Sequence, residues 1–332
     1  MATDVSFEIL DLRHFTAPLL RPVLEAEGAL WRQRLHWDYR SAAKLLTQYL
    51  DSRSLPGYAA VENGQLIGYV FCVYEESKAI VGDVFALPGN SIAQAPAREA
   101  RAHEIEESLL LHLFELLTNS PPVDRVESQL LLHPSGSHTA VFRQAGFQIY
   151  RRLFMVQPLR GFFTAPCVDL PPGLELRPWR DDDLSPAARL IAAAYPVHPD
   201  SVVNDQYRSV HGSQRFLNNI VRYSGCGAFS AQVSHVVVDP LSRELAAMVL
   251  GSRVSPESGH VTQICVHPEF RRRGLARMLL NLAASRFLRQ GVAEISLTVT
   301  EANSGATELY RSEGYYCEHS FDAAVWQRGS TV

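Results

Sequence analysis

One order of predicted elements occurs twice along the chain. Each half opens with a strand and helical stretches, continues with two β-rich runs joined by a turn, and then has a long helix and another strand. Each closes with a similar segment, VFRQAGF at 141–147 and LYRSEGY at 309–315. In the first half, Asn63-Gly64 joins the β-rich runs and favours a type I′ hairpin. A duplicated α+β unit with a mixed α/β sheet explains this order better than two unrelated α/β domains.

The boundary between the halves is predicted from prolines. PLRGFFTAPCVDLPPG at 158–173 contains four prolines and two glycines, which fit no periodic element. We therefore expect one domain at 1–159, a linker at 160–172 and a second domain at 173–332. A length of 332 residues is typical of two domains.

Composition excludes several classes of protein. The net charge of −4 provides no positive field for nucleic acid, and no apolar run reaches the roughly 18 residues of a membrane helix. The N-terminus MATDVSFEIL does not resemble a secretory signal. The five cysteines form no C-x-x-C pair, which argues against a structural zinc site and a disulfide scaffold. We expect a cytoplasmic monomer or homodimer that binds no metal, nucleic acid or membrane.

The segment HVTQICVHPEFRRRGLARMLL at 260–280 carries the strongest functional signal. Its first part, 261–266, is β-branched and apolar, and helical periodicity begins after Gly274. The turn between them therefore leads into a helix N-terminus, where unpaired N–H groups and the helix dipole attract anions. Gly274 and Ala276 leave room for phosphate oxygens. Positive charge comes from Arg271, Arg272, Arg273 and Arg277. The predicted ligand is a diphosphate.

A second segment, LTVTEANSGATELYRSEGYY at 297–316, follows one strand later. Asn303 is a natural helix N-cap, Tyr310 lies in the short helix, and Gly314 is placed to end it. Together the two segments resemble the GNAT superfamily of acyl-CoA-dependent N-acetyltransferases. The pyrophosphate pattern matches at Arg271, Gly274 and Ala276, and the pattern N-x-x-A-x-x-L-Y-x-x-x-G-[FY] matches from Asn303 to Tyr315. The resemblance implies two tandem GNAT folds.

The resemblance also implies how acetyl-CoA binds as co-substrate. The strand before the phosphate turn would part from its neighbour, and its backbone would bind pantetheine. Amides of 271–276 would bind the pyrophosphate, and an N–H near Cys265 or Val266 would face the thioester carbonyl. Asn303 would cap its helix beside the co-substrate. The implied acetyl-CoA contacts are Ile264, Cys265, Val266, Arg271, Arg272, Arg273, Gly274, Leu275, Ala276, Arg277 and Asn303.

Catalytic roles follow from the same resemblance. Tyr310 corresponds to the tyrosine that protonates the departing CoA thiolate. The position of the glutamate base of some relatives is Thr298 here, so the base acts through water or is another residue. Among titratable side chains nearby we favour His260. An acyl-enzyme on Cys265 is disfavoured, because buried cysteines usually only fill space.

The first half departs from the family's pattern. Its expected turn, GNSIAQAPAREARAHE, lacks the phosphate motif, and Phe142 stands where Tyr310 stands in the second half. We expect a degenerate unit that keeps the fold, has lost acetyl-CoA chemistry, and supports the active half or walls its acceptor groove.

These features predict an acetyltransferase acting by direct attack on a primary amine, with a small molecule or a peptide as the acceptor. The loop 195–213, with Tyr195, His198 and Asp200, is the expected source of specificity. A non-catalytic acyl-CoA sensor or assembly module is the alternative. Nucleic-acid binding through 271–273 fits the negative net charge poorly.

Overall fold

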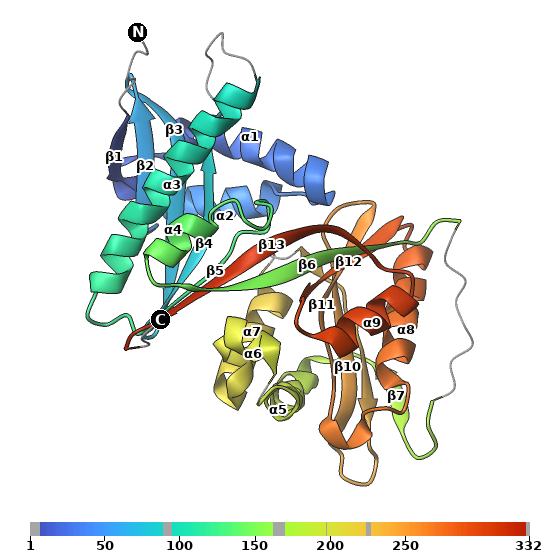
Figure 1. The fold of residues 1–332 in the computed structure, drawn as a ribbon. Coiled ribbons are helices and arrows are strands. Elements are labelled where there is room, and N and C mark those ends of the chain that lie inside the picture. The colour runs from blue at the N-terminus through green and yellow to red at the C-terminus, as the bar shows by residue number, and fades with distance from the viewer. Residues whose placement is uncertain (1–6, 89–94, 162–169, 197, 224–226, 330–332) are drawn as a thin grey trace. The chain divides into compact units, whose positions relative to one another are not determined.

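The computed structural model describes residues 7–88, 95–161, 170–196, 198–223 and 227–329. The chain forms two compact units (Figure 1). Unit 1 contains residues 1–35, 39–151 and 321–332, and unit 2 contains residues 36–38 and 152–320. Each unit has one sheet with helices on both faces, as the repeated order of elements predicts.

The sheet of unit 1 has the strand order β1-β2-β3-β4-β5-β13. All its neighbouring strands are antiparallel except β4 and β5, which are parallel. The predicted hairpin joins β2 to β3, with Asn63 at φ +50° and Gly64 at φ +75°, the two positive values that a type I′ turn needs. The strands are β1 (Glu8–Asp11), β2 (Gly57–Glu62), β3 (Gln65–Glu75), β4 (Lys78–Ala86), β5 (Arg125–Gln129) and β13 (Tyr316–Gln327).

Helices cover both faces of this sheet. α1 (Ala17–Leu35) and α2 (Arg40–Asp51) pack on one face, and α3 (Ala95–Asn119) and α4 (Thr139–Gln144) pack on the other. In α3 the buried residues Ile105, Leu109 and Leu113 recur every four positions, which places them on one stripe of the helix. The two core clusters of unit 1 therefore lie on opposite sides of one sheet.

Unit 2 repeats this arrangement with the strand order β7-β9-β10-β11-β12-β6. Here β11 and β12 are the parallel pair, and the other neighbours along this order are antiparallel. A further short strand, β8, pairs with β10. The strands are β6 (Gln148–Pro158), β7 (Glu175–Pro178), β8 (Ala228–Phe229), β9 (His235–Val238), β10 (Leu245–Arg253), β11 (Ser258–Val266) and β12 (Glu294–Thr300).

The helices of unit 2 also lie on both faces of its sheet. α5 (Leu184–Ala194) and α7 (Val210–Arg222) pack on one face, and α8 (Leu275–Arg289) and α9 (Ser304–Ser312) pack on the other. A short helix, α6 (Pro199–Val203), follows α5. This layering places the start of α8 directly after β11 and the start of α9 directly after β12.

The last strand of each half of the sequence completes the sheet of the other unit. From Arg152 onward β6 pairs with β12 in unit 2, and residues 323–327 of β13 pair with β5 in unit 1. Apart from residues 36–38, which belong to unit 2, the units divide the chain at 151/152 and 320/321, whereas the sequence led us to expect boundaries at 159 and 173. An apolar strand pattern shows that a strand is buried but does not show which sheet it joins. Most of the expected linker, 162–169, lies outside the described residues.

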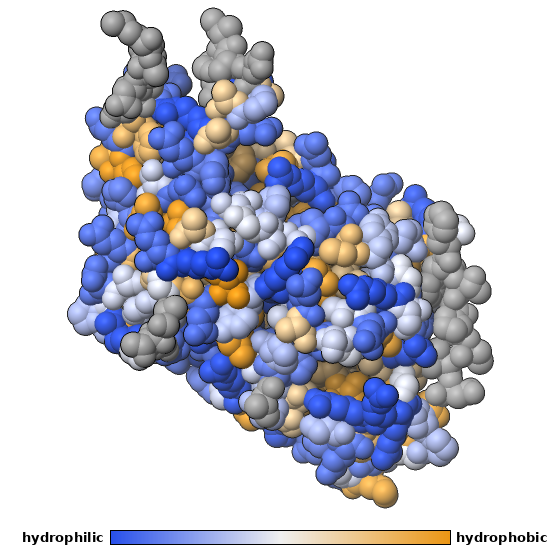
Figure 2. All heavy atoms as spheres, in the orientation of Figure 1, coloured by the Kyte–Doolittle hydropathy of each residue, from blue (hydrophilic) through white to orange (hydrophobic). Residues whose placement is uncertain are grey.

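No helix within the described ranges is long and apolar enough to cross a lipid bilayer. On the face that Figure 2 shows, hydrophobic side chains are scattered among hydrophilic ones. The apolar residues are gathered instead in the four core clusters, two in each unit.

Candidate functional site

A cavity of about 550 Å³ opens in unit 2 where its two parallel strands part. Residues 258–260 of β11 pair with 294–296 of β12. In the described part of unit 2 the pairing ends there, although β11 continues to Val266 and β12 to Thr300. Residues 261–266 and 297–299 line the cavity. One backbone edge of β11 is thus accessible from the cavity, in the opening that the resemblance implies.

The N-terminus of α8 forms one wall of this cavity. The helix begins after Gly274, which has φ +80°, and no described side chain caps it. Glycine adopts a positive φ without strain, so this residue suits the sharp entry into the helix. Gly274, Leu275 and Ala276 all line the cavity. The N–H groups of the first turn and the positive end of the helix dipole therefore face the space where we predicted a diphosphate.

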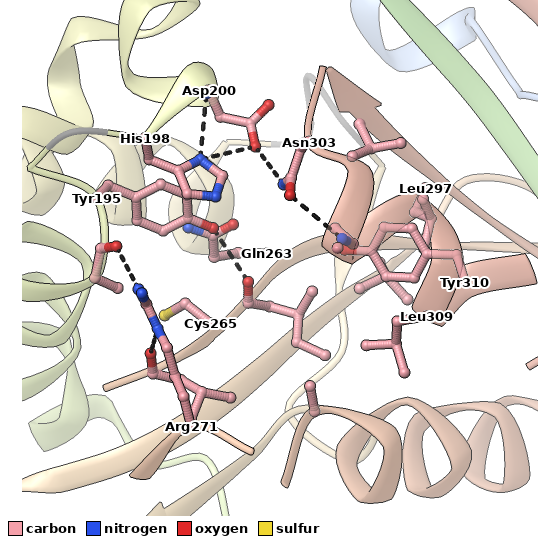
Figure 3. A pocket seen from close by; sticks show the side chains of 18 of the residues that line it. Tyr195, His198, Asp200, Gln263, Cys265, Arg271, Leu297, Asn303, Leu309 and Tyr310 are labelled. Carbon is pink, nitrogen blue, oxygen red and sulfur yellow. Dashed lines mark hydrogen bonds and ion pairs between the residues drawn. The ribbon is translucent and has the colours of Figure 1, made fainter. Parts of the chain in front are cut away.

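Arg271 braces this wall through its side chain. Its Nη2 donates to the carbonyl oxygen of Ala194 at 2.7 Å, and its Nε donates to that of Val266 at 3.4 Å. These bonds join the end of α5 to the end of β11 beside the cavity (Figure 3). Arg272 also lines the cavity and has φ +64°, a left-handed value uncommon for arginine.

Of the two other arginines expected to bind acetyl-CoA, only one lines the cavity. Arg277 lines the cavity and forms an ion pair with Glu313. Arg273 is not among the residues that line the cavity, and its guanidinium lies over the ring of Phe270, 5.1 Å from the centroid. The side chain of Arg273 is thus the one member of the expected set that the structure places elsewhere.

The β11 segment expected to bind pantetheine borders the cavity as well. The hydroxyl of Tyr195 donates to the carbonyl oxygen of Ile264 at 3.2 Å. Cys265 lines the cavity but is buried, and burial raises the pKa of its thiol well above the usual range despite nearby Arg271. A protonated thiol is a poor nucleophile, which agrees with the expectation that Cys265 only fills space.

α9 presents its N-cap and one tyrosine to the same space. The side chain of Asn303 accepts a hydrogen bond from the amide of Ala306, as its N-cap position predicts. Tyr310 lines the cavity two turns later. Burial, and then the negative charge of Asp200, raise the pKa of the Tyr310 phenol well above its ordinary value. The phenol therefore holds its proton until a strong base comes within reach.

His260 lies away from these groups. It is not among the cavity-lining residues, and its Nδ1 lies 2.9 Å from Oγ of Ser296. Its ring packs against Trp37, with 4.9 Å between centroids, and stacks with Phe154. Burial, and then the charge of Arg152, lower the pKa of His260 to about 3. Both its place and its low basicity disfavour the role of general base.

A different histidine does line the cavity. Nδ1 of His198 lies 3.3 Å from Oδ2 of Asp200 (Figure 3). Asp200 is held in turn from across the opening, because Nδ2 of Asn303 donates to its Oδ2 and both the amide and the hydroxyl of Thr300 donate to its Oδ1. Sequence reasoning placed His198 and Asp200 in the loop that shapes specificity but did not pair them with residues a hundred positions later.

Asp200 stays ionised in this setting. Burial alone would raise the pKa of its carboxyl group, but hydrogen bonds from His198 and Thr300 and the charge of Arg152 lower it to about 2. The site thus joins a fixed carboxylate, an adjacent imidazole and a protonated phenol around one cavity. This set of groups can accept one proton and donate another, as acid–base catalysis requires.

The corresponding place in unit 1 lacks the phenol. Phe142 is buried in α4, where it packs against Phe114 and Phe147. Of the turn that we expected to lack a phosphate motif, residues 89–94 lie outside the described part of the chain.

Comparison with known proteins relates this geometry to a family. Residues 203–315 match the model of the acetyltransferase (GNAT) family. A GCN5-related N-acetyltransferase from Sphaerobacter thermophilus superposes with a TM-score of 0.63 at 15% identity, covering 98% of this chain and 97% of that chain. A tandem GNAT protein from the clavulanic acid biosynthesis pathway gives 0.55 at 15%, covering 98% and 100%. A GNAT-family acetyltransferase from Colwellia psychrerythraea gives 0.54 at 11%, covering 97% and 100%. The prediction of two tandem GNAT folds is confirmed.

Proposed function

With residues 203–315 identified as a GNAT domain, whose fold serves acyl transfer from acyl-CoA, we propose that unit 2 transfers an acetyl group from acetyl-CoA to a primary amine. The observation that carries this proposal is the convergence of three features on one cavity. These are the uncapped start of α8, the open edge of β11 and the buried phenol of Tyr310. A diphosphate, an amide-rich chain and a thioester, in that order, suit these three features.

Binding would use mainly backbone groups. The amides of 271–276 donate hydrogen bonds to the pyrophosphate at the helix N-terminus, with Arg272 and Arg277 adding charge at the cavity wall. The open edge of β11 at 264–266 pairs with the amides of pantetheine. An N–H in this stretch then faces the thioester carbonyl, where negative charge develops as the amine attacks.

We assign the base to His198 in place of His260. Nδ1 of His198 lies 3.3 Å from both the amide nitrogen and Oδ2 of Asp200, so it accepts from the amide when it is unprotonated and donates to the carboxylate when it is protonated. In the tautomer with the proton on Nδ1, the Nε2 lone pair is available to take a proton from the amine, directly or through one water. Asp200 is the positioning residue, because its carboxylate fixes the ring and stabilises the imidazolium that forms. The hydrogen bonds from Thr300 and Asn303 hold that carboxylate in place.

The reaction then balances as a direct transfer. The amine nitrogen bonds to the acetyl carbon, the carbon–sulfur bond breaks, and the sulfur leaves with both electrons. Tyr310 donates its proton to the CoA thiolate, and the proton lost by the amine goes to His198. Cys265 takes no part, since burial keeps its thiol protonated. Unit 1, with Phe142 in place of the acid, carries out no transfer of its own.

The test measures release of the CoA thiol with a panel of amines. Tyr310→Phe keeps the ring and removes the acid, so kcat should fall about 100-fold or more, within the range for general acid catalysis. Binding of acetyl-CoA should stay close to that of wild type. Tyr223→Phe, on a side chain that is 60% exposed, is the matched control and should be fully active.

Two results would count against the assignment. An unchanged kcat in Tyr310→Phe removes the phenol from its role. Acetyl-CoA binding without thiol release for every amine supports a sensor or assembly module in place of an enzyme.

A further inference from the structure

In unit 1 the strand β4 extends beyond its pairing with the parallel strand β5, and polar side chains lie beside its free end. β4 and β5 pair at 78–81 with 125–128, after which β4 continues to Ala86. Glu106 of α3, together with His133 and His138 from the segment between β5 and α4, lies beside the end of β4. By order of elements, this place corresponds to the cavity of unit 2.

The three side chains converge on one point. Nε2 of His138 lies 3.2 Å from Nδ1 of His133 and 3.4 Å from Oε2 of Glu106, and the last two atoms lie 3.7 Å apart. Ligands of a tetrahedral zinc ion at about 2.0–2.2 Å are separated by about 3.4 Å. A point about 2 Å from all three atoms therefore exists, at the length of Zn–N and Zn–O bonds.

Backbone groups of β4 orient two of these three side chains, those of His133 and Glu106. Nε2 of His133 lies 2.9 Å from the carbonyl oxygen of Val84, an acceptor only, so this nitrogen carries the ring proton and Nδ1 presents a lone pair. The amide of Ala86 donates to Oε1 of Glu106 at 3.2 Å, which leaves Oε2 directed at the histidines. Ligating histidines usually donate their other N–H to a carbonyl or carboxylate in this way.

The third ligand can present a lone pair as well. Without an ion, Nε2 of His138 donates to Nδ1 of His133; an ion would replace that proton, and the ring proton would then lie on Nδ1, which is buried and has no hydrogen-bond partner among the described residues. The side chains of Glu106, His133 and His138 are 9%, 12% and 3% exposed. Burial raises the pKa of Glu106 and lowers the pKa of both histidines, to about 4 for His138. A bound cation would offset the free-energy cost of burying the ionised carboxylate of Glu106.

We propose that Glu106, His133 and His138 bind one divalent transition-metal ion, with Zn²⁺ the best match to two imidazoles and a carboxylate in tetrahedral geometry. Water completes the fourth position. The ion joins α3 to the segment before α4, beside the end of β4. This proposal does not depend on the proposed catalytic function.

A neighbouring set, His103, Glu107 and His138, is the competing site. Its first two members are more exposed, at 42% and 32% of their side chains. The ring of His103 stacks on that of His138, at 4.8 Å between centroids and 22° between planes. Stacked rings present their nitrogens at the edges, so His103 covers the His138 ring and is poorly placed to share an ion with it.

The experiment loads the full chain, free of any affinity tag, with Zn²⁺ and measures bound metal after gel filtration. We expect one ion per chain in wild type. Glu106→Gln and His133→Gln should each weaken binding by more than about 10-fold, since even groups that only orient ligands contribute 10- to 100-fold. His103→Gln and Glu107→Gln are matched controls and should bind as wild type does. Circular dichroism confirms that each variant is folded.

Co²⁺ gives a readout that needs no variant. In wild type it should show the intense visible bands of a tetrahedral ion, and Zn²⁺ should displace it. Three results overturn the proposal: no stoichiometric Zn²⁺ in wild type, only the weak bands of an octahedral ion with Co²⁺, or loss of binding in His103→Gln but not in Glu106→Gln. In the first case the three groups form only a hydrogen-bonded cluster.

Discussion

Replacing Asp200 by asparagine tests the central contact of the proposed site. The pKa of this carboxyl group is lowered from 3.8 to about 2, because hydrogen bonds and the charge of Arg152 outweigh burial. At pH values above the pKa of the unfolded state, a shift of this size stabilises the fold by about 2 kcal/mol. Asp200→Asn should forfeit about that amount, and its amide nitrogen would also face the donors on Thr300 and Asn303.

Hydrogen exchange followed by mass spectrometry measures this loss where it occurs. Peptides from β12 and α9 should exchange roughly 30-fold faster in Asp200→Asn at neutral pH, since each 1.4 kcal/mol is a factor of ten. The matched control is Asp239→Asn, on an exposed turn after β9, which should leave these peptides unchanged.

The lowered pKa of Asp200 also determines how the stability difference between wild type and Asp200→Asn changes with pH. A lowered carboxyl pKa stabilises the fold above the unfolded value of 3.8, and this stability is lost as pH falls through about 2. The difference between wild type and Asp200→Asn should therefore shrink over that window. Equal exchange at neutral pH, or a difference that persists unchanged at the acidic end, would refute the reasoning.

Three further predictions follow from single contacts. His198→Ala should lower kcat about 100-fold at neutral pH and recover partly at alkaline pH, where the acceptor amine loses its proton unaided; a flat loss across a pH series would exclude the role of base. Gly274→Ala should weaken acetyl-CoA binding about 10-fold in calorimetry, since φ +80° strains alanine by about 1–2 kcal/mol although no atom lies within 4 Å of the added Cβ. Unchanged affinity would show that this turn does not hold the ligand. Burial raises the pKa of Glu27, so wild-type unit 1 should lose stability as pH rises above 4.5. Glu27→Gln keeps the bond from Tyr69 and should reduce that loss in urea unfolding of the full chain, although buried Asp83 and Glu106, whose pKa values are also raised, retain their share; an identical pH dependence in the two proteins would contradict the reasoning.

Local signals in the sequence predicted the backbone of the cavity wall at the start of α8 and of its surroundings well. The change from strand to helix at Gly274, the N-cap at Asn303 and the hairpin at Asn63-Gly64 each depend on a few adjacent residues. Such features follow from backbone preferences and hydrophobic periodicity, which a single sequence contains. The same holds for the layered order of elements in both units.

Contacts between distant segments were not predictable in this way. The exchange of β6 and β13 between sheets depends on which open edge each strand meets. Asp200 joins residues a hundred positions away, and His260 is turned into a packed interior rather than toward the cavity. The cysteine count likewise gave no indication of the cluster at Glu106, because none of its three members is a cysteine and Glu106 is far in sequence from the two histidines.

Calorimetric titration of the full chain with acetyl-CoA tests the central claim most directly. We expect one molecule to bind per chain, held by the start of α8 and the open edge of β11 in unit 2, and none to bind in unit 1. No binding would contradict the proposed function of the unit 2 cavity. Two molecules per chain would contradict the conclusion that unit 1 has lost acetyl-CoA chemistry.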